Sequence, residues 1–420
     1  MRKFVVVLIC SLAYQNSICQ TKTDTLKLDL PSIEALFLPR NLQLISANYN
    51  IEIATALKEQ ASYWDNPVLN TDQSIYDGQF FKHTATRGQI FIQIQQLIKT
   101  AGKRNKLLLS YEDEILKSKE GWKELLRQLK FSITQAYLGL EQSQSYLTLN
   151  SNEAQLLSTL VKASEERYQK GYISLKELTR VQALQQLNSK ERFDIQTEVL
   201  NQQQYLKALL RIQNDTFLVA ETGSPIPVSK FTLGDYNSLL DSANKNRPDL
   251  NLAKLSAQQS LHNLNYQKSL VYPDITAGVE YDRLSSYLPN YYGLSISLPI
   301  PLFNKNKGNI KAASAQVLQQ KVQTEDLQQS IEKEVWASLS NYLNVEKLLM
   351  SGAVVSTSMQ EMMQKMTESY QNRQINFLEF IDFFQTYKES NKLIIDRKLL
   401  WWQSFAQLNY STNTTLQIIK

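Results

Sequence analysis

Four methionines with the spacing of one helix face are the residues of this sequence most suggestive of metal chemistry. They fall within "MQEMMQKM", at Met359, Met362, Met363 and Met366. Thioether sulfur is a ligand for Cu(I), so the stripe allows a copper site. The same spacing is that of a packing stripe, and methionine fills uneven grooves between helices well. We favour packing and expect no metal site here.

The other reactive residue types offer little for catalysis. The two histidines, His83 and His262, have no Cys, His or carboxylate neighbours at metal-ligand spacing, and we expect both on the surface. The stretch "AGK" at Ala101–Lys103 lacks the preceding glycine of a phosphate-binding loop. So few histidines support no Ser–His–Asp or Cys–His set. The sequence therefore predicts neither an enzyme nor a bound cofactor.

The first residues have the form of a secretory signal peptide. A basic start, "MRK", precedes the short apolar run "FVVVLICSLA" and a polar exit, which predicts a signal peptide over residues 1–19. Both cysteines, Cys10 and Cys19, lie in this segment, so no disulfide framework is expected. Acylation of Cys19 is a weaker alternative, because Ile18 is a poor residue before a lipoprotein cleavage site.

Charge, hydropathy and proline placement limit the class of protein. The chain has 45 basic and 40 acidic residues, and they are interspersed, which does not favour nucleic acid binding. Beyond the signal segment no run of about 18 apolar residues occurs, so we expect no transmembrane helix. Residues 68–224 and 302–420 contain no proline, and very long helices are therefore permitted there.

The sequence repeats one order of elements. The phrase "YQKGYISLKEL", Tyr168–Leu178, returns as "YQNRQINFLEF", Tyr370–Phe380, and each follows a helix, two strand-like segments and a long helix. The first repeat is predicted over 20–212, with strands near 67–97, a long helix near 101–167, a tip near 168–174 and a return helix near 175–212. The second is predicted over 241–410, with strands near 273–299, a long helix near 307–371, a tip near 370–376 and a return helix near 377–408. Residues 213–240 are expected to form an intervening linker, and residues 411–420 a C-terminal tail.

Periodicity supports these elements and sets a limit on the sheet. Three of the strands alternate at period two, as in Ile90, Ile92 and Ile94, whereas the strand near Val68–Ile75 alternates poorly. A heptad seam runs along the first long helix, through Trp122, Leu126, Leu129, Ile133, Ala136 and Leu140. The predicted fold is mostly α with a small β part. Four short strands cannot close a membrane barrel, so several protomers must pool their strands if these enter lipid.

Each repeated phrase reads as the tip of a helical hairpin. In the first, Gly171 supplies the left-handed residue that ends one helix, and Ser174 caps the next. In the second, Asn376 is the expected cap. Arg373 stands where the first tip has its glycine, so we expect the neighbouring Asn372 to accommodate the left-handed conformation.

With these features the sequence resembles the TolC-like outer-membrane efflux family, over essentially the whole mature chain. The likeness rests on the duplicated order of elements and on "TAGKRNK" (Thr100–Lys106), "NRPDL" (Asn246–Leu250) and "LPIPLFNKNKGNI" (Leu298–Ile310). The last segment is most similar to the cation-efflux (Czc/Cus-type) branch. The resemblance implies a homotrimer in which four strands per protomer form a twelve-stranded outer-membrane β-barrel and the long helices form a periplasmic α-barrel.

The resemblance also implies which residues form the periplasmic gate. In the family, acidic residues lie nine and twelve positions beyond the tip tyrosine. Those positions are Glu379 and Asp382 after Tyr370; after Tyr168 they are Glu177 and the basic Arg180. We expect Glu379, Asp382 and Glu177, with Arg373, to control the gate and its selectivity, because threefold symmetry makes each carboxylate a ring of three. The tip residues expected to dock an adaptor are Tyr168, Gly171, Ser174, Tyr370, Asn372 and Asn376.

The function implied by the resemblance is a passive exit duct of a tripartite efflux pump. Substrates, heavy-metal cations first among them, would come from an inner-membrane transporter of the RND type through a periplasmic adaptor. A multidrug or organic-solute duct, or a type I secretion duct of the same fold, is the alternative. From the residues alone, a soluble periplasmic coiled-coil adaptor stays open, although two matching hairpins disfavour it. The long helices disfavour a diffusion porin.

Overall fold

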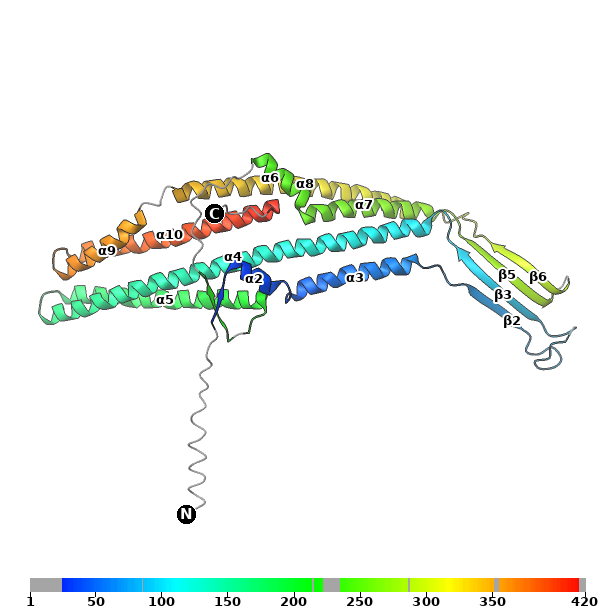
Figure 1. Ribbon diagram of the computed structural model, residues 1–420, viewed down its shortest axis with the longest axis horizontal. Helices are drawn as coiled ribbons and strands as arrows, with labels where there is room; N and C mark the ends of the chain where they lie inside the picture. The colour runs from blue at the N-terminus through cyan, green and yellow to red at the C-terminus, as the bar shows by residue number, and fades with distance from the viewer. Residues whose placement is uncertain are drawn as a thin grey trace, which may run out of the picture.

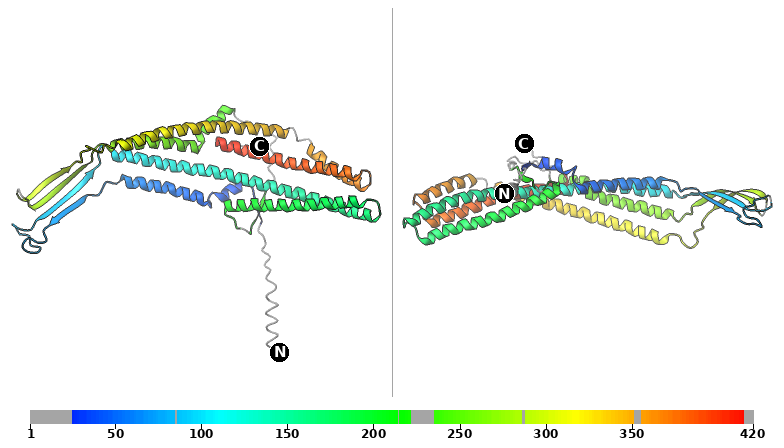
Figure 2. Two further views of the ribbon diagram at one scale, coloured as in Figure 1. Left: turned by 180° about the vertical axis from the view of Figure 1, so that it is seen from behind. Right: turned by 90° about the horizontal axis from the view of Figure 1, so that it is seen from below.

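The chain forms one elongated body with a β-sheet at one end and two helical hairpin tips at the other (Figure 1). The computed structural model describes residues 25–84, 86–213, 215–221, 235–285, 288–350 and 355–414. The predicted signal peptide, including Cys19, and residues 415–420 of the predicted tail lie outside the described residues. Two further views show the same slender, gently curved layer of helices (Figure 2).

The first repeat contains a helix, a strand pair and a long hairpin. Helix α3 (Leu42–Ser62) precedes strands β2 (Val68–Gln73) and β3 (Ile90–Ile98), and the hairpin consists of α4 (Lys103–Gln169) and α5 (Leu175–Leu210). Helix α4 has 67 residues, which at 1.5 Å per residue gives a length of about 100 Å. A helix of this length extends from the sheet to the tip and sets the length of the molecule.

The second repeat follows the same order. Its elements are α7 (Pro248–Ser269), β5 (Ile275–Leu284), β6 (Pro289–Ser297), α8 (Lys307–Met350), α9 (Val355–Gln371) and α10 (Phe377–Thr412). Where one helix was expected over 307–371, the structure describes two, and residues 351–354 between them lie outside the described residues. The predicted fold class, mostly helical with duplicated hairpins and a small β part, is confirmed.

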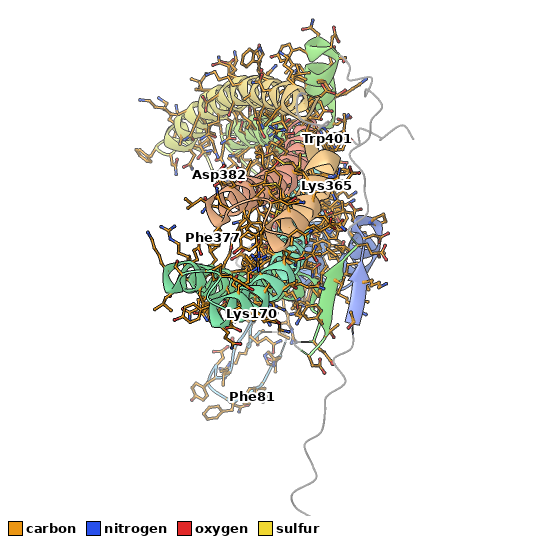
Figure 3. The ribbon with its side chains drawn as sticks, turned by 90° about the vertical axis from the view of Figure 1, so that its left-hand side faces the viewer. Phe81, Lys170, Lys365, Phe377, Asp382 and Trp401 are labelled. Carbon is orange, nitrogen blue, oxygen red and sulfur yellow. The ribbon has the colours of Figure 1, made fainter. Side chains whose placement is uncertain are left out.

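A small layer lies on one side of the helices near their middle. Strand β1 (Thr25–Leu28) pairs in parallel with β4 (Phe217–Ala220), and helix α2 (Leu30–Phe37) lies beside them (Figures 1 and 3). Helix α6 (Tyr236–Asn246) lies apart from them, against α8 and α10. The segment expected as linker therefore contains a strand and the start of a helix. The partner of β4 is β1, at the other end of the first repeat, so the sequence of residues 213–240 alone does not predict this strand.

The four remaining strands make one antiparallel sheet in the order β2-β3-β5-β6. The central pair, β3 and β5, joins the two repeats. Strands β2 and β6 are the edges of the sheet. At its helical end, Lys103 Nζ lies 2.6 Å from both Asp274 Oδ1 and the carbonyl oxygen of Tyr272. This contact ties the start of α4 to the end of the second repeat's first helix.

One hydrophobic cluster in the middle of the body unites both repeats. It contains Phe37 of α2, Leu140 of α4, Tyr342 of α8 and Trp401 of α10, all buried. The predicted heptad seam is confirmed: Leu129, Ile133, Ala136 and Leu140 are buried, and Trp122 and Leu126 pack against the cluster. Within the described residues, no helix is both long and apolar enough to cross a membrane.

Two arginines hold the end of α10 against the start of α7. Arg247 donates to Glu334 Oε2 at 2.7 Å and to the carbonyl oxygen of Ser411 at 2.9 Å, and it pairs with Asp249. Arg127 donates to the carbonyl oxygen of Tyr410 at 2.7 Å. Burial alone would raise the pKa of Asp249, but hydrogen bonds and charge from Arg247 hold it below its ordinary value. The carboxylate therefore stays ionised, and the two helices meet end to end.

Candidate functional site: the hairpin tips and the two faces of the sheet

The first tip has the conformation that its sequence predicts. Gly171 has a φ of 72°, in the left-handed region. Ser174 caps α5: its hydroxyl accepts the Glu177 N–H at 3.2 Å, and the Glu177 carboxylate accepts the Ser174 N–H at 3.2 Å. This reciprocal pair is a capping box. The carboxylate of Glu177 is thereby engaged in holding the start of α5.

The second tip differs from the prediction at its left-handed residue. Asn376 caps α10 as expected, accepting the Glu379 N–H at 2.9 Å. The residue with positive φ is Arg373, at 63°, so the expectation for Asn372 was wrong. Arg373 lies three residues after Tyr370, as Gly171 lies three after Tyr168. The turn geometry is common to both hairpins and overrides the side-chain preference, at a cost of about 1–2 kcal/mol.

Contacts between the tips were not foreseen from the sequence. Arg167, at the end of α4, donates to the carbonyl oxygen of Tyr370 at 2.9 Å and also to that of Gln371. Its guanidinium lies 5.0 Å from the centre of the Tyr370 ring. In the opposite direction, the guanidinium of Arg373 lies 4.1 Å from the centre of the Tyr172 ring. Each hairpin thus presents an arginine to an aromatic ring of the other.

An apolar cluster lies behind the tips and includes part of the methionine stripe. Leu160, Val181, Met363, Tyr370 and Phe380 are among its buried members. Of the other stripe residues, Met359 and Met366 are half-buried and Met362 is exposed. Met363 therefore packs in the apolar cluster while its neighbour Met362 is exposed. This supports the packing interpretation, because the thioethers do not share one environment.

The predicted gate carboxylates differ in whether other side chains of the protein bind them. Glu379 is exposed, but the side chain of Asn376 donates to its carboxylate at 3.0 Å. Asp382 is exposed, and its carboxylate makes no ion pair among the described residues. Figure 3 places Asp382 on α10, on the side of the molecule away from β1 and β4. Asp382 is therefore the most available of these carboxylates; its role in a gate stays a prediction.

A buried carboxylate, Glu153, joins α4 to α5 and α10. It is 2% exposed, accepts from Asn188 Nδ2 at 3.1 Å, and lies 3.5 Å from Lys388 Nζ. Lys388 and Lys392 both bind Glu191 as well. Burial raises the pKa of Glu153, although Lys388 opposes the rise. The sequence offered no signal for this site, because its members come from three helices.

The two faces of the sheet are chemically different. Four residues in register, Leu69, Ile94, Val279 and Leu294, form an apolar row that crosses all strands. Their side chains are 63%, 51%, 61% and 72% exposed. Such a row in a single chain leaves a large apolar surface without a protein partner.

The opposite face carries a polar row. Gln93 accepts from Asn70 Nδ2 at 3.3 Å and donates to Glu280 Oε2 at 2.8 Å and to Ser295 Oγ at 3.0 Å. These residues alternate with the apolar row along every strand. The sequence showed the alternation in three of the strands but not clearly in β2. Only the register of the strands shows that these side chains form one row.

The two histidines lie at the surface but are only partly exposed. Both are half-buried, and His262 Nδ1 lies 2.5 Å from Asp113 Oδ2 on α4. The contact with Asp113 could not be foreseen, because that carboxylate is distant in sequence. In the part of the chain that the structure describes, no group of three or more His, Cys, Asp and Glu side chains could hold a metal ion.

Comparison with solved structures shows which class of protein has this fold. The chain shares 18% identity with a structure of CusC, at a TM-score of 0.75, covering 94% of this chain and 95% of that one. It shares 16% with the outer membrane protein VceC of Vibrio cholerae (TM-score 0.73; 92% and 97% covered). It shares 16% with the open-state MtrE outer membrane channel of Neisseria gonorrhoeae (TM-score 0.71; 96% and 94% covered). The fold is therefore the one that these outer-membrane proteins share.

A family match agrees with this fold. Residues 239–413, essentially the second repeat, match the model of the family described as "Outer membrane efflux protein". The match covers less than half of the chain. No curated protein sequence matches the chain.

Proposed function

We propose that this protein is the outer-membrane exit duct of an efflux pump, through which substrate leaves passively. The family match of residues 239–413 and the fold support this role. The observation that carries it is the sheet, which has one exposed apolar face and one polar face at the end of a helical body about 100 Å long. The strands would sit in the outer membrane and the helices would cross the periplasm, after export directed by residues 1–19.

The edges of the sheet support assembly into a trimer. Every residue of β2 is exposed, and most of β6 is as well. Open edges are not stable in lipid, because unpaired backbone groups there have no water to bind. Three copies would supply twelve strands and let β2 of one protomer pair with β6 of the next. A soluble adaptor would leave both edges and the apolar face uncovered.

In this assembly the polar face of the sheet would line the exit. Glu280 would then recur three times around the lumen, as would Asp382 at the opposite end. Rings of carboxylates attract cations and repel anions, so the duct would favour cationic cargo. Heavy-metal cations are our first proposal, supported by the segment Leu298–Ile310; drugs or other organic solutes are the second candidate.

The tips would meet a periplasmic adaptor that connects the duct to an inner-membrane pump, which we propose to be of the RND type. Tyr168 and Gly171 are exposed at the first tip, whereas Tyr370 is buried behind the second. Asn372 and Asn376 of the second tip are exposed as well, so the tips differ in their tyrosines. Because its tyrosine is available to a partner, we assign docking mainly to the first tip and closing of the passage to the second.

Two measurements test the proposed function. The protein should fractionate with the outer membrane, and native mass spectrometry of the detergent-solubilised protein should give a trimer. That trimer should conduct ions in a planar bilayer. A water-soluble monomer that does not conduct would contradict the duct and favour an adaptor.

A further inference from the structure

Aromatic side chains gather where the strands join the helices. They are exposed and lie in short connections: after α3, before β5 and after β6. They are Tyr63, Trp64, Tyr272 and Phe303. Aromatic residues collect at the water–lipid interface of membrane proteins. If the strands are embedded as proposed above, this belt marks the periplasmic surface of the outer membrane.

A cavity of about 430 Å³ opens beside this belt, between α4 and α7. Its lining includes Lys106 and Leu109 of α4 and His262, Asn265, Lys268 and Tyr272 of α7. Lys106 lies in the first turn of α4, and Tyr272 lies three residues before β5. The cavity therefore lies within about one helical turn of the strands, and one of its walls is part of the aromatic belt.

The cavity opens on the side of the molecule that carries α2. Leu109, Leu116, Lys123 and Lys130 follow one another at seven-residue spacing, which keeps them on one side of α4. Lys130 pairs with Glu34 of α2 at 2.8 Å. Asp382 lies on the other side of the molecule, away from β1 and β4 (Figure 3). The cavity thus faces outward rather than toward the proposed lumen.

The charge at this cavity is positive and unpaired. Among the described residues, neither Lys106 nor Lys268 makes an ion pair with a carboxylate. The nearby lysine Lys103 is already paired with Asp274, and the carboxylate of Asp113 faces His262. Two ammonium groups beside an apolar leucine and a tyrosine suit a ligand with a phosphate and an acyl chain.

We propose that this cavity binds the headgroup of an anionic phospholipid from the periplasmic leaflet of the outer membrane. Lys106 and Lys268 bind the phosphate, Tyr272, which lies nearer the strands, contacts the first part of an acyl chain, and Leu109 forms the apolar wall on the periplasmic side of the headgroup. This inference rests on the proposed membrane location of the strands. The bound lipid would fix the depth at which the duct sits in the membrane.

The test uses the full-length trimer, delipidated in detergent and titrated with palmitoyl-oleoyl-phosphatidylglycerol under native mass spectrometry. We expect about one retained lipid per protomer. The double variant Lys106→Gln/Lys268→Gln should bind at least about tenfold more weakly, since each lysine near a headgroup contributes to binding. Lys119→Gln/Lys123→Gln removes the same charge from the same side of α4, about 20 Å farther from the belt, and should bind as wild type.

Further arms separate this proposal from its alternatives. Diacylglycerol, which has no phosphate, should be retained much less than the phospholipid. Equal retention of diacylglycerol, full displacement of the lipid by inorganic phosphate, or unchanged binding in the Lys106/Lys268 variant would each overturn the inference. If the double variant does not form trimers, Lys268→Gln alone must still weaken binding. A trimer that conducts but shows any of those overturning results retains the proposed function and loses only this inference.

Discussion

Glu153 is a carboxylate that folding removes almost entirely from water. Asn188 and Lys388 give it partial compensation, while Lys388 and Lys392 bind the neighbouring Glu191 more closely. The two carboxyl groups therefore shift in opposite directions. Burial raises the pKa of Glu153; for Glu191 the burial effect is outweighed by hydrogen bonds from both lysines, and its pKa is lowered. When ionised, Glu153 therefore lowers the stability of the folded protein and Glu191 raises it.

These shifts predict opposite pH effects for two isosteric variants. A raised folded-state pKa means that the folded protein binds the proton more tightly, so ionised Glu153 subtracts stability as pH rises above the ordinary glutamate pKa. Glu153→Gln should therefore raise the Tm of the detergent-solubilised trimer at pH 8, with the gain shrinking toward pH 4. Glu191→Gln should lower the Tm at pH 8, and its loss should also shrink on acidification. A lower Tm for Glu153→Gln at pH 8 would contradict this.

The two helical hairpins contact each other at their tips through arginine side chains. The guanidinium of Arg167 contacts two carbonyl oxygens at the end of α9, and Arg373 covers the ring of Tyr172. The first hairpin has a glycine at the left-handed position, and the second has an arginine that makes a contact there. Arg373 thus has an unfavourable backbone conformation, but its side chain contacts the other hairpin. Rules for turn residues consider only the local sequence and do not predict this contact.

We expect Arg167→Gln to loosen the tips. The loss of charge-assisted hydrogen bonds and of the ring contact should cost about 2 kcal/mol of the interaction between the hairpins. Single-channel conductance in a planar bilayer should rise or show more frequent open states. Arg192→Gln on α5 is the control, because Arg192 is exposed. Identical traces for wild type and Arg167→Gln would show that these contacts do not restrict the passage.

For the whole molecule, the proposed threefold assembly multiplies each lumen residue. Among the described residues no cation pairs with the carboxylate of Asp382, whereas Asn376 donates to that of Glu379. The two residues should therefore differ in their effect on permeation, even though the family resemblance treats them alike.

Reversal potentials across a salt gradient measure this difference. Asp382→Asn should lower the preference for cations over anions severalfold, and Glu379→Gln should lower it less, because removing three ring charges weakens attraction at a constriction. Asp241→Asn in α6, near the middle of the molecule, is the charge-matched control and should leave the potential unchanged. A wild-type potential in both tip variants would mean that these carboxylates do not line the passage.

The sequence by itself determined the features that depend on neighbouring residues. The absence of proline permitted the long helices, Ser174 and Asn376 defined helix starts, Gly171 defined a turn, and the heptad from Trp122 to Leu140 defined a packing seam. The period-two strands already separated an apolar face from a polar one. Local chemistry is sufficient for these features because each depends on a few consecutive residues.

Only the tertiary structure decided the features that depend on both repeats. The pairing of β1 with β4, the contact of Asp113 with His262, the arginine contacts between the tips and the Glu153 network join residues far apart in the chain. The positive φ of Arg373 belongs here too, because the hairpin imposes it against the preference of the side chain. The family resemblance named both Asp382 and Glu177 as candidates. Only the structure showed that the carboxylate of Asp382 is exposed, whereas that of Glu177 accepts a hydrogen bond from the N–H of Ser174 at the start of α5. Contacts of this kind form only when distant elements pack together, so no pattern among neighbouring residues specifies which residues meet.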